Sequence, residues 1–116
     1  MSSTPSNYCV VITTVANRED AEAIAGALLA EKLAACVQIS AIESLYTWKN
    51  ALARENEFLL SIKTRTGLYD KVEAAIRARH RYEVPEIIAL PILAGAPSYF
   101  GWIDEATGRS EEDGTA

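Results

Sequence analysis

The sequence predicts one α+β domain, a four-stranded antiparallel sheet with two helices on one face, a long hairpin and an extra C-terminal helix. Apolar runs and amphipathic stretches follow one another as strand, helix, strand, strand, helix, strand and short helix. The 116 residues are 49% hydrophobic and 23% charged, which suits a single domain with its own core. We therefore assign residues 8–107 to this domain, residues 1–7 to a flexible leader and residues 108–116 to a flexible acidic tail.

The first strand and helix are expected at the start of the domain. Residues 8–15 are rich in β-branched side chains, which is typical of a buried central strand. Asn17 can cap a helix whose first turn holds Glu19 and Asp20, where the helix dipole favours anions. Apolar residues then recur every three or four positions, so one helix face should cover the sheet. That face comprises Ala21, Ile24, Ala25, Leu28, Leu29 and Leu33.

A long hairpin is expected next. Residues 34–48 are strand-like over more than the usual length, which favours a bend or bulge between Ser40 and Ser44. Residues 49–51 look like a turn. Residues 57–64 alternate between apolar and polar and supply the partner strand.

This hairpin is too long for so small a domain to cover. Tyr46 and Trp48 would be exposed on an unpaired edge, which invites association. We therefore expect symmetric self-assembly, with Tyr46, Trp48 and Trp102 at the subunit interface. The alternative is that these aromatic side chains stack on a ligand.

The remaining elements complete the topology. Thr66 is expected to cap a second helix, and Pro85 prevents helix from continuing. Residues 87–93 form a fourth strand, with Pro91 at an edge or bulge, and residues 98–106 form a short helix. Two split βαβ units with right-handed crossovers give a ferredoxin-like architecture.

The charge balance and the cysteine count exclude several classes. With 11 basic and 16 acidic residues, the net charge of -5 argues against a nucleic-acid surface or an anionic membrane as partner. No apolar run approaches the ~18 residues of a membrane span, and residues 1–7 do not resemble a secretory signal. Cys9 and Cys36 do not make a disulfide scaffold, so we expect a reducing, cytoplasmic location.

The hinge segment, residues 79–88, holds the best candidate metal ligands. His80 is the only histidine, and Glu83 and Glu86 follow it closely. Copper and zinc favour imidazole, and carboxylates add oxygen ligands. Alternatively, His80 stabilises the helix end and bonds a neighbour.

The same region also offers cations. Arg79 and Arg81, together with Lys63, could bind a small anion, because guanidinium groups suit carboxylates and phosphates. The alternative is surface pairing of the arginines with Glu83, Glu86 or Asp70.

We expect no catalytic activity and no organic cofactor. The sequence has no glycine-rich phosphate loop, nucleophile elbow or paired-cysteine zinc motif. A Cys36–His80 dyad is conceivable, since a thiolate and an imidazole can activate each other. Cys36 lies in an apolar run, however, which favours an inert buried thiol.

Several short motifs together resemble the CutA divalent-cation tolerance family. They are Leu33-Ala34-Ala35-Cys36-Val37, Ser44-Leu45-Tyr46-Thr47-Trp48, Ile62-Lys63-Thr64, His80-Arg81-Tyr82-Glu83-Val84-Pro85-Glu86-Ile87-Ile88 and Tyr99-Phe100-Gly101-Trp102-Ile103. The resemblance spans residues 10–107 and implies a ferredoxin-like homotrimer with sheets joined edge to edge. It also implies a cytoplasmic role linked to copper and other divalent cations.

The chain departs from that family pattern at four positions. Asn50 stands where the family often has glycine, and Arg81 where it often has proline after the histidine. Thr13 and Arg79 stand where copper-binding members can have cysteine and a second histidine. The resemblance thus implies the fold more strongly than it implies copper.

The sequence therefore predicts a trimer that binds divalent cations, copper first, through His80 with Glu83 and Glu86. The alternative is a signalling-type trimer that binds a small anion between subunits through Lys63, Arg79 and Arg81. Trimeric ferredoxin-like nitrogen-regulatory proteins resemble this architecture, although fold alone does not establish function. A third possibility is a structural trimer that presents its surface to another protein.

Overall fold

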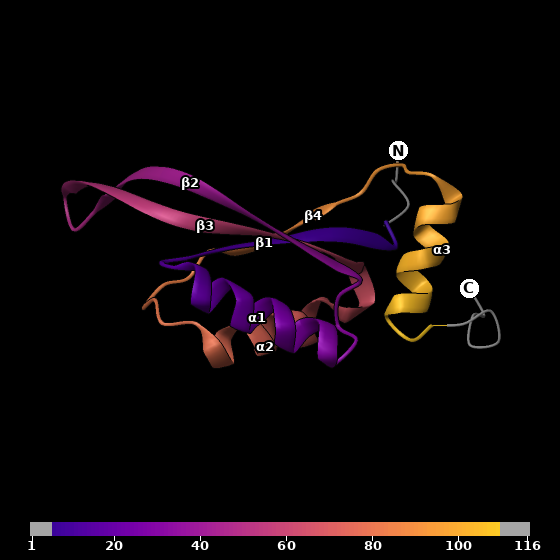
Figure 1. The fold of residues 1–116 in the computed structure, drawn as a ribbon. Helices are drawn as coiled ribbons and strands as arrows, with labels where there is room; N and C mark the ends of the chain where they lie inside the picture. Colours follow the sequence, from indigo (N-terminus) through magenta and orange to yellow (C-terminus); the bar gives the residue numbers. More distant parts are fainter. Residues whose placement is uncertain (1–5, 110–116) are drawn as a thin grey trace.

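The computed structural model describes residues 6–109. The elements are β1 Tyr8–Val15, α1 Arg18–Ala30, β2 Cys36–Trp48, β3 Ala51–Arg65, a 3₁₀ turn Thr66–Leu68, α2 Tyr69–Arg79, β4 Ile87–Pro91 and α3 Pro97–Ala106 (Figure 1). This order confirms the predicted α+β, ferredoxin-like class. Residues 1–5 of the predicted leader and 110–116 of the predicted tail lie outside the described residues.

All four strands form one antiparallel sheet in the order β2-β3-β1-β4. β1 is central, as predicted, and β4 is an edge strand in which Pro91 pairs with Cys9. An edge tolerates proline because its missing N–H is not required by a further strand. Figure 1 shows α1 and α2 on one face of the sheet and α3 at one end of it. None of the described helices combines the length and apolar character needed to cross a membrane.

The hydrophobic core lies between the sheet and the two long helices. Its fully buried side chains alternate along the strands and recur at helical spacing: Val11, Leu60, Ile62, Ile24, Leu28, Val72 and Ile76. Leu29 was predicted to face this core but is 44% exposed, because α1 presents Ile24, Ala25 and Leu28 to the sheet instead. Leu33 lies beyond the helix end and packs against the core from there.

The two long helices begin differently. The side chain of Asn17 accepts a hydrogen bond of 2.8 Å from the backbone N–H of Asp20, which confirms the predicted cap of α1. The predicted Thr66 cap is wrong, since neither the 3₁₀ turn nor α2 has a side-chain cap bond. The Thr66 N–H instead donates to the carbonyl of Asn7 at 2.9 Å, which joins this turn to the start of β1.

The hairpin is more regular than the sequence suggested. β2 and β3 keep one register from Cys36 opposite Lys63 to Trp48 opposite Ala51, so the bulge expected between Ser40 and Ser44 is absent from this described segment. β3 also begins at Ala51 rather than at Glu57. Ala and Arg have little intrinsic preference for strands, but pairing with β2 overrides that weak preference.

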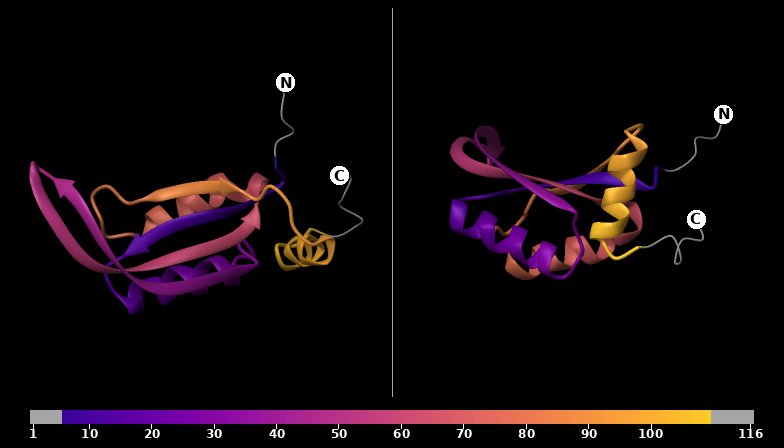
Figure 2. Two further views of the ribbon diagram at one scale, coloured as in Figure 1. Left: turned by 90° about the horizontal axis from the view of Figure 1, so that it is seen from above. Right: turned by 45° about the vertical axis from the view of Figure 1, so that its right-hand side comes forward.

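A two-residue turn closes the hairpin. Lys49 and Asn50 have φ angles of 51° and 67°. Left-handed backbone at both positions matches the right-handed twist of the flanking strands, and asparagine adopts it readily. Figure 2 shows the far part of the hairpin extending beyond the helices and curling away from them.

Candidate functional site

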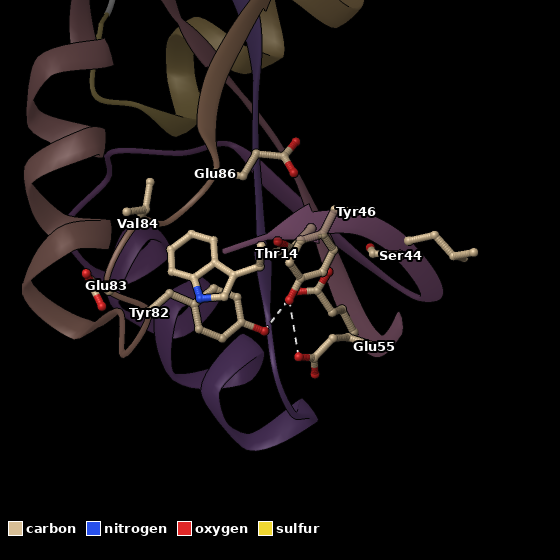
Figure 3. Close-up of a pocket in the computed structure, with 11 residues that line it drawn as sticks. Thr14, Ser44, Tyr46, Glu55, Tyr82, Glu83, Val84 and Glu86 are labelled. Carbon is tan, nitrogen blue, oxygen red and sulfur yellow. Dashed lines mark hydrogen bonds between the residues drawn. The ribbon is translucent and has the colours of Figure 1, made fainter. Parts of the chain in front are cut away.

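A pocket of about 590 Å³ lies between the hairpin and the hinge segment (Figure 3). The hairpin lines it with Ser44, Leu45, Tyr46, Trp48, Glu55 and Glu57, the hinge segment with Tyr82, Glu83, Val84 and Glu86, and β1 with Thr14. This volume is in the range of small-molecule sites.

The register of the hairpin explains why its polar side chains converge there. Ser44 pairs with Glu55, and Glu57 is two residues further along β3. Residues directly opposite each other on paired strands share a face of the sheet, and so do residues two positions apart on one strand. The side chains of Ser44, Glu55 and Glu57 therefore project from the same face. The alternate residues Leu60 and Ile62 point to the helices. The pocket therefore forms on the face of the sheet that carries no helix.

His80 fixes the hinge segment against β1. Its Nε2 lies 2.7 Å from the carbonyl oxygen of Thr14, and the N–H of Tyr82 donates to its Nδ1 at 3.2 Å. Because a carbonyl only accepts, Nε2 carries the hydrogen and Nδ1 is the acceptor. Both ring nitrogens are thus engaged in holding the backbone that presents Tyr82.

Tyr82 then connects the hinge segment to the hairpin. Its hydroxyl donates to Oε2 of Glu57 at 2.7 Å, and the hydroxyl of Tyr46 donates to Oε1 of Glu55 at 3.2 Å. Figure 3 shows the Tyr46 and Tyr82 rings approaching from the hairpin and the hinge segment. Each phenol therefore pairs with a carboxylate at the pocket wall.

The pocket has a strongly negative character. Four glutamates line it, at 55, 57, 83 and 86, and no lysine, arginine or histidine of the described residues does. Burial raises the pKa of Tyr82 far above its ordinary value, and the hydrogen bond to Glu57 and the charges of Glu57 and Glu55 add to this shift. Burial and the bond to Glu55 also raise the pKa of Tyr46. Both hydroxyls therefore remain donors at neutral pH.

The predicted metal ligands are only partly brought together. Glu83 and Glu86 line the pocket, whereas His80 lines a neighbouring pocket of about 70 Å³. Within residues 6–109, no three His, Cys, Asp or Glu side chains are grouped so as to hold a metal ion. A site that uses all three predicted residues thus needs ligands from more than one chain, and it stays a prediction.

The predicted anion-binding cations are also split. Arg79 and Arg81 line the small pocket, but Lys63 lies on β3 and bonds Gln38. Nε of Arg81 lies 3.4 Å from Asp20, and Arg79 reaches Glu31 at 4.0 Å. Surface pairing of the arginines was anticipated, although with other partners than these. The proximity of Asp20 opposes an anion at this position.

The conceivable Cys36–His80 dyad is not formed. Cys36 pairs with Lys63, and Lys63 pairs with Val10, four residues from the Thr14 carbonyl that His80 contacts. At about 3.3 Å per residue, this separates the two side chains by on the order of 13 Å.

The predicted interface residues are exposed in the single chain. Tyr46, Trp48 and Trp102 are 40%, 42% and 44% accessible. Trp102 lies on α3, at the opposite end of the molecule from the tip of the hairpin (Figure 1). One chain therefore does not bring all three together, and their interface role stays a prediction.

Glu55, Glu57 and Tyr82 were not recognised as site residues from the sequence. The alternation of residues 57–64 already placed Glu57 on the polar face. Its partner Tyr82 lies 25 residues later. The available signal was that the hinge segment holds a tyrosine and two glutamates, and that Glu55 and Glu57 lie two positions apart in the hairpin.

The fold and the pocket define a small ferredoxin-like α+β protein with an acidic, aromatic site on the bare face of its sheet. The family model described as "CutA1 divalent ion tolerance protein" matches residues 9–106. The chain belongs to this family.

Known relatives agree with that assignment. The chain is 44% identical over 100 residues to the divalent-cation tolerance protein CutA of Thermus thermophilus, covering 85% of this chain and 97% of that one. It is 44% identical over 110 residues to the chloroplastic protein CutA 1 of Oryza sativa, covering 94% of this chain but only 62% of the rice protein. The structure of the periplasmic divalent cation tolerance protein CutA from Archaeoglobus fulgidus superposes with a TM-score of 0.85 at 37% identity, covering 86% of this chain and 98% of that one. The family name denotes tolerance to ions and not an enzymatic reaction.

Proposed function

We propose that this chain contributes to tolerance of divalent metal ions by binding them at carboxylates of the pocket together with ligands from further copies of the chain, since no three such side chains within residues 6–109 of one chain are grouped to hold an ion. One observation carries the proposal: of residues 6–109, four glutamates and no basic side chain line a single pocket. Glu83 and Glu86 are two of the three ligands expected from the sequence, the third being His80, and Glu55 and Glu57 lie across the same pocket. The family assignment supports divalent ions as the cargo.

The proposal includes copper, as the resemblance implies, but the oxygen donors also suit harder ions such as Mn²⁺. Thr13 is fully buried on β1, and Arg79 pairs with Glu31. Neither replaces the thiolate or imidazole that copper prefers. His80 supplies its ring to Thr14 and Tyr82. We therefore expect the pocket to bind Mn²⁺ as well as Cu²⁺, although Mn²⁺ stands low in the usual affinity order of divalent metals.

We also propose that the chain acts as a cytoplasmic homotrimer. Leu52 and Leu93 are largely exposed, and β2 and β4 are free sheet edges within the described residues. Exposed apolar side chains beside unpaired edges favour joining between copies. Both cysteines are free thiols, which suits a reducing compartment.

Calorimetric titration tests the metal proposal. Cu²⁺ and Mn²⁺ are titrated separately into the full chain and into a Glu83→Gln/Glu86→Gln variant. Glu105→Gln is the matched control, an exposed glutamate on α3 outside the pocket. We expect saturable heat that the double variant weakens by about tenfold or more and the control leaves unchanged. Unsaturable heat, or equal heat in all three proteins, would contradict the proposal.

Light scattering of the same samples tests the assembly. We expect a mass of three times the 12.6 kDa chain at micromolar concentration. A mass of one chain would refute the trimer.

Fractionation of cells that express the full chain tests the location, and recovery of the protein outside the cytoplasm would exclude a cytoplasmic location.

A further inference from the structure

We propose that the pocket also binds an alkylammonium group, a protonated or quaternary amine of an organic ligand. The group would lie among the rings of Tyr46, Trp48 and Tyr82 and beside the carboxylates of Glu55 and Glu57. This goes beyond the proposed metal function, because aromatic rings contribute nothing to the coordination of Mn²⁺ or Mg²⁺ through oxygen.

The aromatic lining is the first observation. Three of the residues that line the pocket are aromatic, and they come from both sides of it, Tyr46 and Trp48 from the hairpin and Tyr82 from the hinge segment. The face of an aromatic ring is electronegative, so a cation over it is attracted, most strongly by tryptophan. The side chain of Lys49 already lies 5.8 Å from the centre of the Trp48 ring, which shows that a cation can approach this indole.

The buried carboxylate of Glu57 is the second observation, independent of the first. Glu57 is only 7% exposed, although it lines the pocket. Among the described residues it forms no salt bridge, and Tyr82 is its hydrogen-bond donor. A carboxylate withdrawn from water without a cationic partner is costly, and a bound cation would relieve that cost.

The combination selects organic over inorganic cations. A small, strongly hydrated ion loses its water reluctantly and gains little from apolar walls. An alkylammonium group carries its charge inside an apolar shell, so Leu45, Val84 and the rings can contact it while the carboxylates neutralise it. Burial is the main reason that the pKa of Tyr82 is raised, and the charges of Glu57 and Glu55, which make the potential here negative, add to the shift.

Choline titration tests the inference on the full chain at neutral pH. Heat is compared for choline chloride, for sodium chloride at equal concentration and for neohexyl alcohol, the uncharged carbon analogue of choline. We expect saturable binding of choline alone. No saturable heat with choline, or an equal response to either control ligand, would overturn the inference.

Matched variants locate the binding. Trp48→Leu keeps an apolar side chain but removes the π face, and we expect about tenfold weaker binding, or about 1.4 kcal/mol. Glu57→Gln should weaken it as well. Tyr99→Leu removes a similarly exposed aromatic ring on α3 and should leave the affinity unchanged. Unchanged affinity in Trp48→Leu, or the same loss in Tyr99→Leu, would refute the proposed position.

The outcome is separable from that of the metal titration. The metal test depends on Glu83 and Glu86, whereas this one depends on Trp48, Glu57 and the charge of the probe. If metal ions bind and choline does not, only the alkylammonium inference fails. If the assembled subunits bury the rings of Tyr46 and Trp48 against one another, choline will not bind, which also overturns it.

Discussion

The two ends of β3 lie in one continuous ladder but in opposite environments. Leu52 and Ile62 are an even number of residues apart and so share a face of the strand, yet Leu52 is 74% exposed and Ile62 is fully buried. The helices α1 and α2 cover the strand at Ile62, and the hairpin extends beyond them at Leu52 (Figure 2). The covered end therefore stabilises the fold, whereas the free end is available for binding and assembly.

The largest effect should come from truncating the buried Ile62, with truncation of the exposed Leu52 as the comparison. Ile62→Ala leaves a cavity in the core, and we expect the free energy of unfolding to fall by about 2–5 kcal/mol. Leu52→Ala removes an exposed side chain and should change the stability of the single chain by less than about 0.5 kcal/mol. Urea unfolding at several protein concentrations measures both. Equal losses for the two variants, independent of concentration, would contradict the division between the two ends.

An intermediate effect is expected where the hinge segment joins the free end of the hairpin. Tyr82→Phe removes the hydroxyl that donates to the buried Glu57. Leaving that acceptor without its donor should cost about 1–3 kcal/mol at neutral pH. Tyr69→Phe is a matched control, because Tyr69 lies on the helix side at the start of α2. A cost equal to that of the control would mean that Tyr82 does not support the pocket.

Alkaline pH sharpens this prediction. The folded-state pKa of Tyr82 is raised, so its stabilising contribution is complete below the unfolded value near 10 and is lost as pH rises through the folded value. The full chain should therefore lose more stability than Tyr82→Phe does between neutral pH and about pH 11. Parallel stability curves for the two proteins would rule out the raised pKa.

The smallest effect should arise on the exposed surface of the covered half. Nε of Arg77 donates to Oε2 of Glu73 at 2.8 Å, and this bond is the main reason that the pKa of Glu73 is lowered. A lowered carboxyl pKa gives stability that is present above the unfolded value and is lost as pH falls through the folded one. Glu73→Gln should thus be slightly less stable than the full chain at pH 7 and equal to it at about pH 2. A difference that persists at low pH would exclude this ion pair as the cause.

Much of the fold could be predicted because its signals are local. The β-branched run of β1, the Asn17 cap and the spacing of Ile24 and Leu28 each act within a few residues. The first half of β3 lacked such a signal, since alanine and arginine form a strand there only by pairing with β2. Thr66 failed as a cap because the 3₁₀ turn already begins at it, with Arg65 in the cap position. Its backbone N–H bonds Asn7, a contact between distant parts of the chain.

The candidate site was less predictable for the same reason. The hinge segment was recognised from its composition, but the role of His80 depends on the position of the Thr14 carbonyl near the end of β1. The burial of Glu57 depends on Tyr82, which the sequence places in a different element. The role of His80 and the burial of Glu57 both arise where side chains from different elements meet. The periodicity of residues within one element cannot predict such contacts.

The uninterrupted register of the hairpin also limits how its length can change during evolution. Side chains alternate across a strand, so one residue inserted into each strand on the base side of Ser44 and Glu55 would turn the rest of the hairpin over. Tyr46 and Glu55 would then point away from the hinge segment. Residues added beyond Trp48 leave these side chains in place, and adding them in pairs to both strands extends the tip in steps of about 7 Å without turning it over. A Lys49-Asn50 turn can be carried outward unchanged by each such step.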